Sequence, residues 1–317
     1  MREFAFSGLV CLAILFAPQL VRSEGEPPSR SSVLIQEVRA GDVTAEQKVE
    51  ATEPPFVTVP RTEFLNLFGS IPFGWARLEG SVDARGDLLA PVLRGYAEAR
   101  LDGARLFGRH NVDFYVDAEA SGREPGSLAE LDLAASLAGL ITIQGLVPNF
   151  DQGYARVTGR VLEKGAGVEG NDLRLGWHQL QYVQFRLNPP NPDGLPEFLA
   201  WGEQRSDGGV VALPFGGGAF SSGERVVLVE VPVGEDLRFE VELETGAADF
   251  NRGLSKADLL STARVALRPG PANPDLVLGI GAVPVPEAGI WLAVVAGCGW
   301  AFARRVRRGG GLLAVRA

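Results

Sequence analysis

The side chains that could carry chemistry are few and widely spaced in this chain of 317 residues. Its two histidines, His110 and His178, are far apart and fit no metal-ligand spacing. There is no His-Glu-x-x-His or Gly-x-Ser-x-Gly motif, and the glycine run 216–218 lacks the Lys-Ser/Thr that a phosphate-binding loop requires. We therefore interpret the histidines as residues of the surface or of a strand face, and we expect no catalytic residue.

Carboxylates are plentiful, so a glycan-active hydrolase is the hardest enzyme class to exclude. Such an enzyme needs two carboxyl groups roughly 5 to 10 Å apart across a cleft, and a sequence does not reveal that separation. Glu240, Glu242 and Glu244 occupy every second position of one predicted strand, so they share a face. We expect this face to be exposed to solvent. Clustered acids also suit Ca²⁺, and the turn 191–194 has ligands of this type without the spacing of an EF-hand loop. We expect no cofactor, with Ca²⁺ as the alternative.

Two tryptophans are the candidate ligand-binding residues, because flat aromatic rings stack against sugars. They are Trp177 and Trp201, and Trp201 follows the proline-rich loop 188–196, which favours exposure. The alternative interpretation of both is packing in the core or against a sheet.

The elements that must position these residues are predicted to be β-strands. Residues 237–244 alternate between apolar and charged side chains, as in a strand with one buried and one solvated face. The run 226–233 precedes it, with a turn at 234–236, so we predict a hairpin. Alternation and short apolar runs predict further strands at 76–84, 92–101, 112–118, 154–163, 183–187, 209–213, 262–267 and 276–280.

The strand pattern predicts the fold class. Segment 127–139 fits either a helix or a strand, whereas 140–143 is rich in β-branched residues and predicts a strand. Forty glycines and 21 prolines argue against a helical protein. About ten antiparallel strands need two sheets to bury their apolar faces. We predict an all-β fold over 61–282, an antiparallel β-sandwich that is jelly-roll-like. The polar, proline-bearing segment 24–60 is predicted to be a linker, in which 33–38 could form a short strand.

The C-terminal part has the pattern of a membrane segment. Residues 288–303 form an uncharged run, which as a helix would span about 24 Å, against roughly 30 Å for a bilayer core. Arg304, Arg305, Arg307 and Arg308 follow directly, and basic residues favour the cytoplasmic side. We predict a single transmembrane helix, with 309–317 as a cytoplasmic tail and everything before the helix outside.

Pro286 and Glu287 stand just before this helix. A Pro-Glu motif, one hydrophobic helix and a basic end, all within 283–308, resemble the PEP-CTERM sorting signal of Gram-negative bacteria, although Ala288 stands where a second proline is usual. The segments 247–251 and 261–265 resemble, more weakly, a strand pair that precedes the signal in such proteins. The resemblance implies an exosortase as the partner that removes the segment, and delivery to the cell surface or extracellular polymer.

The N-terminus agrees with export. Residues 1–23 contain Arg2 and then an apolar stretch at 9–17, and Val21 and Ser23 are small enough to precede a cleavage site at Glu24. We predict a secretory signal peptide. The two cysteines fall in the predicted removable segments, one in each, so the predicted mature part forms no disulfide.

Charge limits the partners of the exported part. The chain has 30 basic and 39 acidic residues, and removal of 1–23 and 284–317 takes away seven basic and two acidic residues, which leaves a net charge of −14. Such a surface repels nucleic acid. We expect an exported, acidic, non-catalytic surface or extracellular-matrix protein that associates with extracellular polysaccharide. The alternative is a secreted carbohydrate-binding module or glycan-active hydrolase.

Overall fold

The computed structural model describes residues 27–39, 42–52, 55–68, 70–144, 151–168, 171–186, 199–206, 208–211, 215–216, 219–249 and 254–284. The predicted signal peptide, the transmembrane segment 288–303 and the tail 309–317 lie outside these ranges. Within them, no helix has the length and apolar character needed to cross a membrane. By internal contacts the chain divides into two units, Met1–Ala282 and Val283–Ala317.

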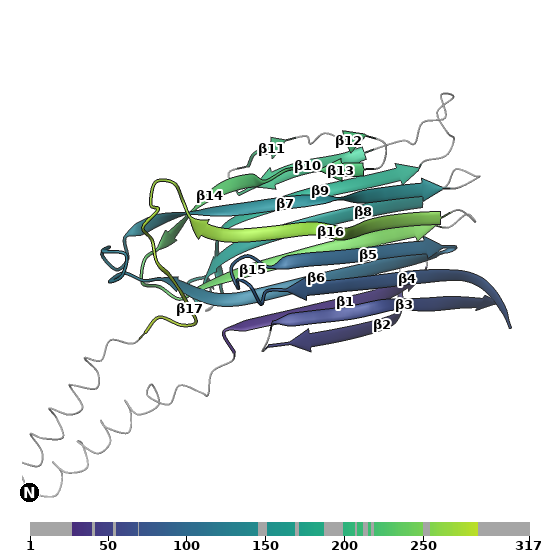
Figure 1. Cartoon of the computed structure of the whole chain (residues 1–317), viewed down its shortest axis with the longest axis horizontal. Helices are drawn as coiled ribbons and strands as arrows, with labels where there is room; N and C mark the ends of the chain where they lie inside the picture. The colour runs from purple at the N-terminus through teal and green to yellow at the C-terminus, as the bar shows by residue number, and fades with distance from the viewer. Residues whose placement is uncertain are drawn as a thin grey trace, which may run out of the picture. The chain divides into compact units, whose positions relative to one another are not determined.

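Two antiparallel sheets make up the described part of the first unit (Figure 1). In spatial order, sheet A contains β11 (Val210–Val211), β10 (Leu199–Arg205), β9 (Leu173–Arg186), β8 (Asp151–Glu163), β15 (Leu237–Asp249), β6 (Asp102–Val116), β1 (Ser29–Arg39) and β2 (Asp42–Ala51), and β17 (Leu278–Ile280) also pairs with β6. Sheet B contains β12 (Phe215–Gly216), β13 (Ala219–Ser221), β7 (Leu128–Gln144), β16 (Leu254–Pro269), β5 (Val92–Arg100), β4 (Ile71–Asp83) and β3 (Phe56–Phe68), and β14 (Arg225–Pro232) also pairs with β7.

The core lies between the two sheets. Along β15, buried and half-buried positions alternate, so Leu237, Phe239, Val241 and Leu243 face the core while the charged residues between them face outward. Sheet B contributes fully buried side chains such as Leu133 to the same cluster. The prediction of an all-β protein with antiparallel sheets is confirmed, and the arrangement is that of a β-sandwich.

The prediction of a linker at 24–60 was wrong. This segment contains β1 and β2 and the start of β3, and β1 pairs with β6 along ten residues while β2 pairs with β1. Val33 and Ile35 are fully buried. The strand signal is weak because β2 is an edge strand in which six of the ten residues are polar and seven of the ten are exposed. Of the prolines that suggested a linker, Pro27 and Pro28 precede β1 and Pro55 follows β2.

The predicted hairpin of 226–233 with 237–244 was also wrong. Both segments are strands, but β14 pairs with β7 in sheet B and β15 pairs with β6 and β8 in sheet A. Gly234, with φ +79°, lies in the turn that takes the chain from one sheet to the other. Both strands bury an alternating apolar face, so the sequence pattern does not distinguish a hairpin from a change of sheet.

All but the first residue of segment 127–139 belongs to the long strand β7, which settles the choice between helix and strand. Leu131, Leu133 and Leu137 are fully buried, and Ala129 and Ala135 fill the remaining inward positions. The period of two is complete once these alanines are counted as core residues. The strand predicted at 140–143 is confirmed as the continuation of β7.

Candidate functional site

The predicted sorting and cleavage residues lie outside the described residues. They are Val21, Ser23, Glu24, Pro286, Glu287, Arg304, Arg305, Arg307 and Arg308. The proposed calcium turn 191–194 also lies outside them. Within the described ranges, no group of three or more His, Cys, Asp or Glu side chains is placed to hold a metal ion.

The two candidate tryptophans do not form one site. Trp177 is half-buried on β9, at a position that faces away from the core. Trp201 belongs to β10 and stands opposite Tyr182 in the strand register, and Tyr182 faces the core. These register positions belong to opposite faces of sheet A. The side chain of Trp201 itself lies outside the described residues.

The three glutamates of β15 share the outer face of sheet A, as predicted, and each is paired with an arginine. Arg109 donates to Glu242 at 2.9 Å, Arg160 lies 3.8 Å from Glu240, and Arg156 pairs with Glu244. Tyr154 also donates to Glu244, at 2.9 Å. These acids therefore balance the arginines of neighbouring strands, which is how a charged outer face is stabilised.

Both histidines are fully buried and lie on strand faces, His110 on β6 and His178 on β9, so of the two interpretations the surface was wrong and the strand face was right. His110 Nε2 lies 2.9 Å from the Leu88 carbonyl, to which it must donate, and its Nδ1 then accepts from the Ser31 hydroxyl at 2.9 Å. Burial lowers the pKa of His110, which favours the neutral ring. This Ser–His pair resembles a nucleophile and base, but both residues are fully buried and a substrate would not reach them.

His178 joins the two sheets. Its Nε2 lies 3.0 Å from Glu203 on β10, and its Nδ1 lies 3.3 Å from the carbonyl of Leu133 on β7. Burial opposes the charge on Glu203, but the Arg205 guanidinium at 2.7 Å and His178 outweigh it, so the pKa of this carboxyl lies below its ordinary value. The group is a structural polar bridge in the core.

A cluster of buried carboxyl groups lies where the chain crosses from β5 in sheet B to β6 in sheet A. Leu101 makes this corner with φ +52° and donates its amide to Asp249 at 3.0 Å. Burial and the neighbouring Glu37 raise the pKa of Asp102 to about 7. Burial acts to raise the pKa of Glu37, but Asp102, the Thr44 hydroxyl at 2.9 Å and the Arg39 guanidinium at 2.6 Å outweigh it, so the pKa of this carboxyl lies below its ordinary value. The raised pKa favours the protonated form of Asp102, and the lowered pKa favours the ionised form of Glu37.

No sequence pattern indicated this cluster, because Glu37 lies in the predicted linker and Asp249 is 147 residues from Asp102. The available sequence signal for this cluster was the position of acidic residues at the ends of predicted strands. Many surface turns have the same feature, so it does not indicate a buried cluster.

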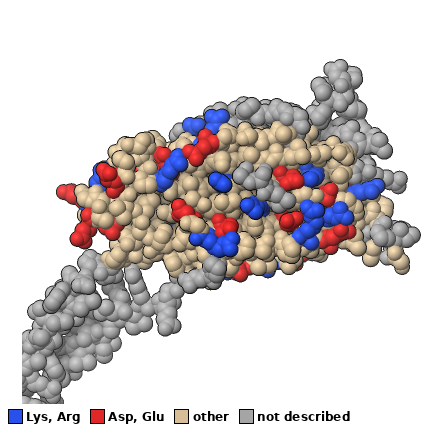
Figure 2. Space-filling model, in the orientation of Figure 1, with Lys and Arg blue, Asp and Glu red and all other residues tan. Residues whose placement is uncertain are grey.

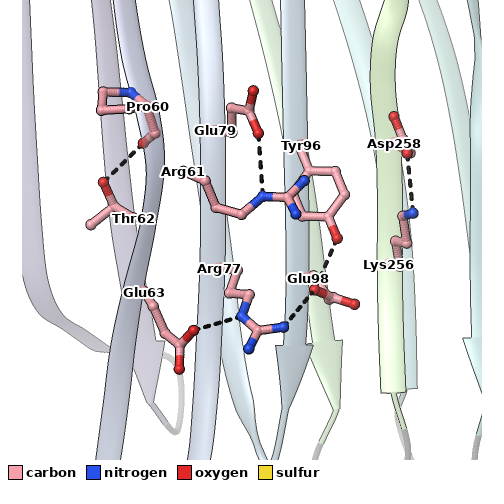
Figure 3. Close-up of polar contacts among 10 residues, drawn as sticks. All are labelled: Pro60, Arg61, Thr62, Glu63, Arg77, Glu79, Tyr96, Glu98, Lys256 and Asp258. Carbon is pink, nitrogen blue, oxygen red and sulfur yellow. Dashed lines mark hydrogen bonds and ion pairs between the residues drawn. The ribbon is translucent and has the colours of Figure 1, made fainter.

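The outer face of sheet B carries a row of alternating charges (Figure 3). Arg77 lies between Glu63 at 2.7 Å and Glu98 at 3.7 Å, so one guanidinium bridges β3, β4 and β5. The aromatic rings of this face are covered by cations, with Arg77 4.2 Å from the Trp75 ring and Arg61 4.4 Å from that of Tyr96. Figure 2 shows acidic and basic side chains interspersed on the visible surface. The rings thus serve packing and charge pairing.

A groove of about 420 Å³ opens on the outer face of sheet A, beside the first residues of β1. Asn111 and Asp113 of β6 lie in it, with Arg30 opposite Asn111 and Arg238 opposite Asp113 in the strand registers. The carbonyl of Pro28 accepts a hydrogen bond from the Asp113 amide at 2.8 Å, which extends the β1–β6 ladder to the wall of the groove. The sequence did not indicate this site, because its wall comes from the predicted linker.

Comparison with known proteins adds no relative: no family profile, curated protein or solved structure matches the chain.

Proposed function

We propose that this chain is an exported, acidic, non-catalytic protein of the cell surface or extracellular matrix, delivered by a PEP-CTERM-like sorting segment. The observation that carries the proposal is the order of features in 283–308, where Pro286 and Glu287 precede an apolar run and four arginines. The apolar segment at 9–17, near the N-terminus, also supports export.

We further propose a jelly-roll topology for the central eight strands. The order β5–β16–β7–β14 in sheet B and β6–β15–β8–β9 in sheet A supports it. Strands β5 to β8 alternate between the sheets along the chain, and so do β14 to β16. Two interlocked Greek keys produce this nested order. In this topology β1 to β4 extend both sheets on one side.

A non-catalytic role is supported by the state of the acids on the outer face of sheet A. Glu240, Glu242 and Glu244 are each within 4 Å of an arginine and partly buried. A glycosidase acid must be held near a reacting bond with its partner carboxyl across a cleft. Carboxylates that neutralise adjacent arginines are better suited to stabilising the sheet.

The mass of the C-terminus in membrane and extracellular fractions tests the targeting proposal. The native chain is expected to yield a species that ends near Pro286, together with an unprocessed membrane-bound precursor. The double variant Pro286→Ala/Glu287→Ala is expected to accumulate as precursor, whereas Pro284→Ala, which removes a proline outside the motif, is processed. Only full-length chain ending at Ala317 in the native strain would contradict the proposal.

A further inference from the structure

We propose that the groove formed by β1, β6 and β15 binds a neutral saccharide. This deepens the proposed extracellular role by naming a ligand class and a site, but it depends on the groove alone. The cavity of about 420 Å³ is within the range of about 300 to 1,000 Å³ that small-ligand sites occupy. A groove of that volume can hold a short stretch of a polysaccharide, and the rest of the polysaccharide would stay outside the groove.

The charges that line the groove already balance one another. Asp113 accepts from Lys164 at 2.6 Å and from Arg238 at 2.9 Å, and Arg30 pairs with Glu50. Arg238 also lies 3.4 Å from Asp172. An anionic ligand would have to compete with these carboxylates for the arginines. A neutral ligand can use the remaining hydrogen-bonding capacity of both kinds of group without separating an ion pair.

Asn111 is the uncommitted polar group of the groove. It is half-buried between Arg30 on one side and Glu240 on the other in the registers of sheet A. Its carboxamide forms no hydrogen bond with any residue that the structure describes. An amide offers two donors and one acceptor in a plane, so it can both donate to and accept from neighbouring hydroxyl groups. Sugars present such hydroxyls in pairs.

The wall of the groove supplies apolar surface beside these polar groups. Pro27 and Pro28 are exposed and line it, and their rings are rigid. A pyranose presents C–H groups on one face and hydroxyls around its rim, which matches an apolar wall above a polar floor. A fully apolar ligand would leave Asn111 without a partner and bury charged groups, which costs free energy.

Direct titration tests the proposal. The full-length chain is purified in a sugar-free zwitterionic detergent and titrated by calorimetry with neutral oligosaccharides built from glucose, galactose, mannose or N-acetylglucosamine. Oligogalacturonate and inorganic phosphate serve as anionic probes. We expect saturable binding of at least one neutral oligosaccharide and weaker or no binding of the anions.

Variants locate the site. Asn111→Ala is expected to weaken binding about tenfold, as for the loss of one or two hydrogen bonds to a ligand, and Asn111→Ser is expected to weaken it less. Gln181→Ala is the matched control, because it removes a carboxamide from the outer face of sheet A on β9, away from the groove. All three should unfold at the temperature of the native chain.

Three results would overturn the proposal. They are no binding of any neutral oligosaccharide, binding of the anions alone, and an affinity that Asn111→Ala leaves unchanged. The titration does not involve sorting, so its failure leaves the targeting proposal intact. Failure of C-terminal processing in turn leaves the groove proposal intact.

Discussion

Asp249 and Leu101 are 148 residues apart in sequence, yet the carboxylate of Asp249 accepts the amide hydrogen of Leu101 at 3.0 Å. Leu101 is the non-glycine residue with positive φ among the described residues, and it forms the one-residue step from β5 to β6. A left-handed conformation costs roughly 1 to 2 kcal/mol for such a residue. The bond to Asp249 helps to hold this strained step between the two sheets.

Removal of that carboxylate should destabilise the sandwich. Asp249→Ala leaves the amide of Leu101 without its acceptor in a buried place, so we expect a loss of about 1 to 3 kcal/mol in the free energy of unfolding. Asp249→Asn keeps an acceptor oxygen and should lose less. Urea unfolding followed by tryptophan fluorescence measures both. Equal stability of the native chain and Asp249→Ala would contradict this role.

Asp102 makes stability depend on pH. Its pKa in the folded protein is about 7, raised from an ordinary value of 3.8, so the folded state binds the proton more tightly than the unfolded state. Stability should therefore fall as pH rises from about 4 to about 7, and then level off. Asp102→Asn mimics the protonated form and should remove this decline, making the variant the more stable one at pH 8 by the order of 1 to 3 kcal/mol.

The measurement is the free energy of unfolding of the native chain and of Asp102→Asn at pH 4.5, 6 and 8. The carboxyl of Glu37 has a lowered pKa, so its contribution has the opposite sign: it is present above the ordinary pKa and lost as pH falls further. The acid limb below pH 4.5 should therefore persist in Asp102→Asn. A native chain whose stability rises from pH 4.5 to 8 would show that the proton does not reside on Asp102.

Gly74 should tolerate no side chain. A Cβ at this position would lie 2.7 Å from the carbonyl oxygen of Arg100 and 2.8 Å from that of Leu101, and backbone at the sheet crossing has little room to move. Gly74→Ala is expected to cost about 1 to 3 kcal/mol. Gly86→Ala is the control, because nothing lies within 4 Å of its added methyl group, and it should change stability by less than about 0.5 kcal/mol. Thermal unfolding distinguishes them, and equal melting temperatures would argue against the tight crossing.

The parts of the fold that could be predicted are those with a regular pattern. The alternation at 237–244 identified β15 and its outward glutamates, because a strand with one buried face repeats every two residues. Strand pairing could not be predicted in the same way. β14 and β15 are adjacent in sequence and equally alternating, yet they belong to different sheets, and only contacts with β7 and β6 decide this.

The candidate site was missed for a related reason. β2 is an edge strand with six polar residues among ten, and its inward residues Ala45, Val49 and Ala51 are only half-buried, so the physical signal of burial is weak in it. Pro27 and Pro28 suggested a linker, although proline is tolerated at the first residues of a strand. Asn111 and Arg30 come together only through the β1–β6 register. Trp177 and Trp201 stood out by residue type, and the register separates them.

The side of the membrane on which the sandwich lies is the most direct test of the account. A reporter enzyme that is active only outside the cytoplasm is inserted between Ala282 and Val283, the boundary of the two units, with both terminal segments kept. The account predicts reporter activity, and loss of that activity when residues 1–23 are deleted. An inactive reporter on an intact, folded chain in the cytoplasm would contradict export, and with it the proposed surface or matrix role.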